Sequence, residues 1–152
     1  MGLFDFFAPS NEPTSDGDAP QPASSIIKGH DSSFPMVFIK RLKPHNNGTH
    51  MQLYCHIVNN WPEAVELDKI RIFGTTRELD TELRPHEERE FVIYDGPALT
   101  REHHESELIY KTRKEADYFE TIHTMTFAYN ANDKTYLPSD IRVEGPVRDI
   151  YG

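Results

Sequence analysis

Hydrophobic and polar side chains alternate along one segment in the last third of the chain, from Phe119 to Tyr129. Bulky side chains occupy most of the odd positions, whereas Glu120 and two threonines occupy even ones. A half-buried β-strand turns alternate side chains to opposite faces, so this period of two predicts a strand with one face in a core. His123 falls on the apolar face, and we expect it to be a buried core residue with satisfied ring nitrogens rather than a catalytic one.

The same alternation predicts several other short strands. The segment from His50 to Asn59 carries Cys55 on its apolar side and His56 on its polar side, which separates that thiol from that imidazole. Asn46-Asn47-Gly48 precedes it and predicts a hairpin, because type I′ turns need positive φ at both central residues. The remaining predicted strands are Met36 to Arg41, Glu66 to Gly74, Leu79 to Leu83, Arg89 to Tyr94, Glu107 to Thr112, Thr135 to Leu137 and Asp140 to Glu144.

Two features limit this assignment of strands. The residues around Glu107 to Thr112 favour helix by composition, so a helix is the alternative for that segment. Asp95-Gly96-Pro97 and Gly145-Pro146 follow predicted strands, and we expect each to end its strand.

The number and spacing of these segments predict the fold class. Short strands in such number, with turn signals about every eight to twelve residues, are typical of an all-β domain built as a single two-layer antiparallel β-sandwich. The spacing resembles that of immunoglobulin and fibronectin-like sandwiches. The resemblance is one of pattern, because the paired cysteines of antibody domains are absent and Trp61 follows Cys55 too closely to be their core tryptophan.

The first 35 residues differ in composition from the rest. Pro, Ser, Asp, Ala and Asn dominate residues 8–35, which offer little apolar surface to offset the entropy of ordering the chain. We therefore predict a disordered acidic tail over residues 1–35 and a folded domain over residues 36–152. The tail begins with four large apolar side chains, and we expect this tip to bind a protein partner. Packing back onto the domain, or a peripheral membrane contact through the three phenylalanines, are the alternatives. The tip consists of Leu3, Phe4, Phe6 and Phe7.

Charge and cysteine content narrow the class of function. The chain has 16 Lys and Arg against 25 Asp and Glu, a formal charge of −9 that disfavours binding to nucleic acid. Cys55 is the only cysteine, which excludes an intramolecular disulfide and a Cys-rich zinc site. The sequence has neither the layout of a secretory signal nor an apolar stretch long enough to span a bilayer, so we expect a cytoplasmic protein.

Histidine and glutamate offer a candidate metal site. His103, His104 and Glu105 are consecutive, and His86 is a possible further ligand. Imidazole and carboxylate groups are the donors that zinc accepts, although consecutive residues on a strand point to opposite faces. A metal-binding or small-ligand-binding protein, with or without metal-dependent catalysis, is therefore our alternative function.

Motifs for common catalytic chemistry are absent from the sequence. It contains no Gly-x-Ser-x-Gly elbow, no Walker loop and no Gly-x-Gly-x-x-Gly fingerprint, so we assign no catalytic residue and expect no cofactor. Trp61 is a second candidate for partner binding, with capping of one end of the sandwich as the alternative. We expect a non-enzymatic protein-interaction or structural module that binds another protein or itself.

Overall fold

Two β-sheets make up the part of the chain that the structure describes. The computed structural model describes residues 26–28, 33–47, 49–114 and 116–149, and none of them is helical. The strands are β1 (Ile26–Lys28), β2 (Val37–Asn46), β3 (His50–Asn59), β4 (Val65–Ile72), β5 (Thr75–Leu83), β6 (Glu88–Pro97), β7 (His103–Thr112), β8 (Tyr118–Asn130) and β9 (Thr135–Asp149). The predicted all-β fold is confirmed.

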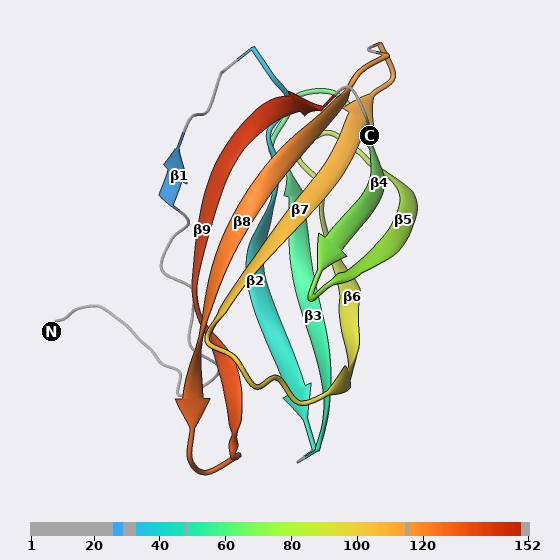
Figure 1. Ribbon diagram of the computed structural model, residues 1–152. Coiled ribbons are helices and arrows are strands. Elements are labelled where there is room, and N and C mark those ends of the chain that lie inside the picture. The colour runs from blue at the N-terminus through green and yellow to red at the C-terminus, as the bar shows by residue number, and fades with distance from the viewer. Residues whose placement is uncertain (1–25, 29–32, 48, 115, 150–152) are drawn as a thin grey trace, which may run out of the picture.

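The sheets differ in size and lie one behind the other (Figure 1). The large sheet has the strand order β1-β9-β8-β7-β4-β5, and the small sheet has the order β2-β3-β6. Every hydrogen-bonded pair of neighbouring strands is antiparallel except β1 with β9, which is parallel. The described residues contain no helix that could cross a membrane.

Several predicted boundaries need correction. The segment Glu107 to Thr112 belongs to strand β7, so the helical alternative is wrong. The two predicted segments after Thr135 form the single strand β9. The expected stop at Gly145-Pro146 is also wrong, because β9 continues through it, whereas β6 ends at Pro97, within the predicted stop Asp95-Gly96-Pro97. Only one side of β6 is paired, so Pro97 can lack its N–H there without breaking a bond of the sheet.

Gly145 explains how β9 passes its proline without ending. The pairing of β8 with β9 shifts register between Glu120 and Ile122, opposite this glycine. Gly145 has a φ of 103°, and a Cβ at this position would lie 3.1 Å from the carbonyl oxygen of Glu120. Only glycine adopts that backbone without strain, so a bulge forms and the strand resumes beyond it.

Ordered contacts begin before the predicted start of the domain at Met36. Most of the predicted tail, including Leu3, Phe4, Phe6 and Phe7, lies outside the described residues. Within the tail, β1 pairs with Arg142 to Glu144 of β9. Phe34 packs against the core, with its ring centroid 5.3 Å from that of Phe119.

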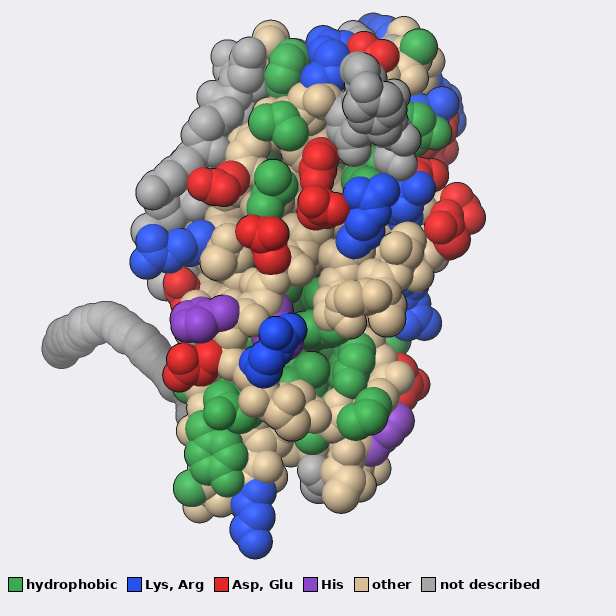
Figure 2. Space-filling view, viewed as in Figure 1, with side chains coloured by type: hydrophobic (Ala, Val, Ile, Leu, Met, Phe, Trp, Pro, Cys, Tyr) green, Lys and Arg blue, Asp and Glu red, His purple; other side chains and the backbone are tan. Residues whose placement is uncertain are grey.

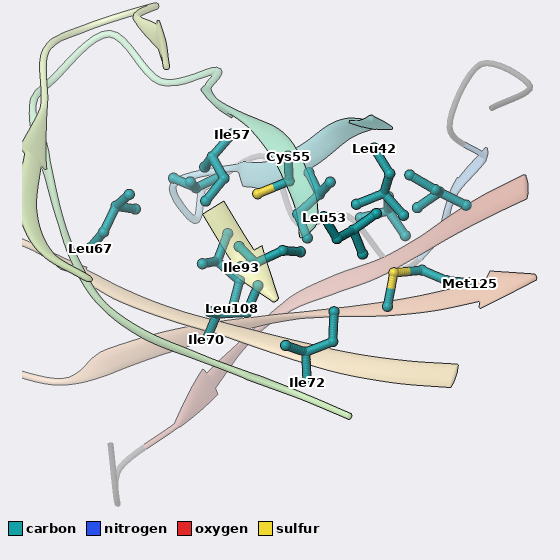
Figure 3. Close-up of a cluster of buried hydrophobic side chains, with 14 of the residues drawn as sticks. Leu42, Leu53, Cys55, Ile57, Leu67, Ile70, Ile72, Ile93, Leu108 and Met125 are labelled. Atoms are coloured by element: carbon teal, nitrogen blue, oxygen red, sulfur yellow. The ribbon is translucent and has the colours of Figure 1, made fainter. Parts of the chain in front are cut away.

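Alternate residues of the facing strands fill the space between the sheets. Figure 3 shows Leu53, Cys55 and Ile57 of β3 on the same side of their strand, directed at side chains of the opposite sheet. All three are fully buried. Burial, with a smaller contribution from the charge of Glu90, raises the pKa of the Cys55 thiol well above its usual range. Because the thiolate is the reactive form, Cys55 is an inert core residue.

Candidate functional site

A small set of polar side chains lies between the sheets. His123 of β8 is fully buried, and the backbone N–H of Ile39 on β2 donates to its Nε2 at 2.8 Å. The accepting nitrogen is unprotonated, so the ring is neutral with its proton on Nδ1. Burial alone lowers the pKa of His123 to about 3. The expected burial of His123 is confirmed, but only one of its ring nitrogens has a partner among the described residues.

Tyr110 makes a similar connection one step along β2. Its hydroxyl donates to the carbonyl oxygen of Pro35 at 2.8 Å and accepts from the N–H of Val37 at 3.4 Å. The hydroxyl of Thr121 lies 2.8 Å away. Burial raises the pKa of Tyr110, so the phenol remains neutral. At the start of β2, the backbone groups that face away from β3 are therefore bonded to side chains of the large sheet. We call His123 and Tyr110 with these partners the inner seam.

One buried asparagine organises the end of the sandwich near Trp61. The Asn59 amide nitrogen donates to the carbonyl oxygens of Glu63 at 2.9 Å and of Arg84 at 3.0 Å, which lie in two different loops. Trp61, in the loop after β3, is half-buried and packs against the core.

The outer face of the small sheet carries a ladder of opposite charges. His56 lies between two glutamates of β6, with Nδ1 at 2.8 Å from Glu88 and Nε2 at 3.1 Å from Glu90. Carboxylates only accept, so both contacts form together when each ring nitrogen carries a proton. The bond to His56 and a weaker contribution from Lys40 lower the pKa of Glu88. Lys43 extends the ladder at 3.7 Å from Glu90. We call this group the outer ladder.

The largest of the described hollows lies on the outer face of the large sheet, over β4 and β5, and has a volume of about 470 Å³. Figure 2 shows acidic and basic side chains interspersed over the outer face of this sheet. The Lys111 ammonium lies 5.6 Å from the ring centroid of Tyr118 at the side of the hollow. The hollow is lined by Glu66, Leu67, Asp68, Asp80, Thr81, Glu82, Lys111 and Tyr118.

Three carboxylates meet at the rim of this hollow. Among the described residues, only Asp68, Glu78 and Asp80 bring three potential metal-ligand atoms within 4.8 Å of one another. They meet because the pairing of β4 with β5 shifts register after Leu67, and Asp80 adopts a left-handed φ of 42°. Calcium takes about six to eight oxygen ligands, so three half-exposed or exposed carboxylates attract a cation without enclosing it. We therefore assign no metal to this group.

The predicted metal ligands are not brought together. His103 and Glu105 are exposed, whereas His104 points to the other side of β7. His86 is in the turn between β5 and β6, and the register of β5, β4 and β7 puts that turn beside Thr112. The two ends of β7 are about 30 Å apart at the usual rise per residue, so His86 cannot share an ion with His103.

His104 has a structural role instead. Its ring centroid lies 4.7 Å from that of Phe73 and 5.3 Å from that of Phe127, edge to face in both cases. Its Nε2 lies 3.2 Å from the carbonyl oxygen of Arg101, which makes Nε2–H the donor. Partial burial, the largest of several influences, lowers its pKa. Phe73 has a φ of 54°, unusual for a bulky residue, and packing in this aromatic cluster offsets the strain.

The sequence did contain a signal for the carboxylate group. Apolar residues of β4 fall at 65, 67, 70 and 72, so the alternation slips by one position at Asp68. Such a slip indicates a bulge. The inner seam had no comparable signal, because nothing local indicates which amide the ring of His123 meets.

Comparison with protein-family models, curated proteins and solved structures gave no match. The chemistry assigned to these regions rests on their geometry.

Proposed function

We propose that this chain is a non-enzymatic interaction module of the immunoglobulin or fibronectin type, and that its N-terminal tip binds a protein partner. The order of the strands supports the fold type. If β2 to β8 correspond to strands A, B, C, C′, E, F and G, the sheets have the orders A-B-E and C′-C-F-G. Strand β9 is then an addition beside strand G.

The observation that carries the non-enzymatic proposal is the state of the reactive side chains. Cys55 and His123 are both fully buried, and burial shifts the pKa of each toward its neutral form. A nucleophile or a general base needs access to substrate and a pKa suited to its charge change, and these two residues have neither.

The tip is the leading candidate for the contact because of its composition. Four large apolar side chains in five residues are unusual in a polar segment, and short apolar segments on long arms commonly dock into grooves of other proteins. The eighteen residues between Phe7 and Ile26 would give such an arm a mean reach of about 25 Å if it behaves as a flexible chain.

The test compares two variants of the full chain. One carries serine at positions 3, 4, 6 and 7, and the matched control carries serine at four polar tail positions, Asn11, Glu12, Thr14 and Asp16. We expect the first variant to lose a co-purifying protein that the wild type and the control retain, with all three melting at the same temperature. Identical sets of co-purifying proteins would refute the proposal.

A further inference from the structure

The edges of the two sheets are closed by different means. Edge strands expose unpaired backbone N–H and C=O groups, to which another chain can add. The first residues of strand β2 are closed by the inner seam, because the N–H groups of Val37 and Ile39 donate to Tyr110 and His123. Strands β5 and β6 are rich in exposed charged side chains, which disfavour added strands. These are Arg77, Glu78, Asp80 and Glu82 on β5, and Glu88, Arg89, Glu90 and Asp95 on β6.

Strand β9 is closed by a third means. Its pairing with β8 leaves one edge, and Pro138 and Pro146 interrupt the N–H groups at two positions along the strand. Between these prolines the pairing of β9 with β8 is regular from Asp140 to Glu144, and β1 pairs there with Arg142, Val143 and Glu144. Figure 1 shows β1 as a short strand beside the long β9. Among the residues that the structure describes, this cover is three residues long.

The charged side chains of this segment suit antiparallel pairing of β9 with the β9 of a second copy. A two-fold axis perpendicular to the sheet joins two copies of β9 in antiparallel fashion and keeps their inner faces on the same side. With the axis at Ile141, Asp140 of each copy lies directly opposite Arg142 of the other. Both residues are on the outer face, and within one chain Arg142 Nε already lies 3.4 Å from Asp140. Opposite charges at directly opposed positions stabilise such a pair.

We propose that the edge of β9 around Ile141, in the regular stretch from Asp140 to Glu144, is a strand-addition site for a second copy of this chain, and that β1 covers this site in the monomer. The two occupants exclude each other, because β1 already bonds Arg142 and Val143. The site does not depend on the partner of the N-terminal tip, because it uses only residues of β9.

The test uses pure full-length protein, whose monomer mass is 17.6 kDa, in analytical ultracentrifugation over a range of concentrations. Ile26→Pro/Ile27→Pro removes backbone donors of β1, the strand that covers the site. We expect the wild type to stay monomeric and this variant to form a dimer of twice the mass. A variant that is monomeric at every concentration overturns the proposal. So does a wild-type dimer that the prolines abolish, because it indicates exchange of β1 between copies.

Charge reversal in the proline background tests the register. Arg142→Asp puts like charges opposite each other at two symmetric positions and weakens the dimer at least about tenfold. Adding Asp140→Arg restores the opposite charges between copies and within the strand, and restores the dimer. This double reversal also controls for folding, because it keeps the net charge of the proline variant. If the dimer is equally stable in the proline variant and in both charge variants, the assignment of the edge is overturned.

Discussion

The inner seam and the outer ladder use the same residue type for opposite purposes. His123 in the seam is neutral and accepts a hydrogen bond from Ile39. His56 in the ladder faces two carboxylates, to which it donates from both nitrogens when it carries a charge. Water can hydrogen-bond to a polar atom of the outer ladder that has no protein partner, whereas a polar atom of the inner seam that has none is buried away from water. In this protein, the contribution of a polar group to stability therefore depends on its access to water more than on the number of its hydrogen bonds.

The largest expected effect comes from a charge introduced into the interior. Asn59→Asp replaces a donating amide with a carboxylate that faces the carbonyl oxygens of Glu63 and Arg84. We expect a loss of about 4 kcal/mol in the free energy of unfolding, measured in urea. The neighbouring Asn60 is exposed, so Asn60→Asp is the matched control and should change stability by less than about 0.5 kcal/mol. Equal effects would remove the distinction between interior and surface.

Lowering the pH tests how much the neutral ring of His123 in the inner seam contributes to stability. Its folded-state pKa of about 3 lies below its unfolded value, so the unfolded chain binds more protons between these limits and stability falls as pH decreases. The loss begins below pH of about 6.5 and reaches about 3 kcal/mol by pH of about 4.5, at about 1.4 kcal/mol per unit. His123→Gln should flatten this slope in unfolding titrations across the range. An unchanged slope would show that other groups cause it.

Leucine substitutions compare the two histidines directly. His123→Leu leaves the N–H of Ile39 buried without an acceptor, and we expect a loss of about 2 kcal/mol in stability. His56→Leu removes surface contacts with Glu88 and Glu90 and should lower stability by less than about 1 kcal/mol. In thermal unfolding measured in 1 M salt, the stability lost through His56→Leu should become smaller, whereas the loss through His123→Leu should not change, because salt screens exposed charges. Salt sensitivity at position 123 instead would reverse the comparison.

The smallest effect is expected at the carboxylates of the large sheet. Asp80→Asn relieves repulsion from Asp68 and Glu78 and keeps a residue type that tolerates a left-handed φ. We expect a gain of about 0.3 kcal/mol, visible as a rise in melting temperature of about 1–2 °C. Asp133→Asn, the same change in charge at an exposed position of the turn between β8 and β9, should give no gain. A loss of stability at position 80 would mean that the carboxylate makes a favourable contact.

The alternation along the chain predicted much of the fold. It located β3 to the residue, put β8 at Tyr118 to Asn130 within one residue at each end, and assigned Cys55 and His123 to the core. The boundary was wrong at Gly145-Pro146, which lies inside β9 just beyond the residues that pair with β1. Glycine and proline break a strand only when a bond of the sheet is lost, which depends on the neighbouring strand.

The candidate sites were harder to predict than the strands. The metal hypothesis combined His86 with His103. In the sheet, His103 is at the start of β7, and the turn that contains His86 lies beside the other end of that strand. The carboxylates that do meet come from positions 68, 78 and 80, on two strands whose pairing the local pattern does not give. The sequence pattern indicated which face of its strand a residue occupies, but it did not indicate which residues of other strands lie beside it.

The local pattern of side chains is enough to assign most strands and the apolar face of each, because the period of two is a local property of an extended backbone. The edges of the sheets, the groups that close them, and the contacts of His123 with Ile39 and of His56 with two glutamates arise only when the sheets pack. These contacts join residues 84, 32 and 34 positions apart. Such pairings follow from the packing of two whole sheets, and no short stretch of the chain encodes them.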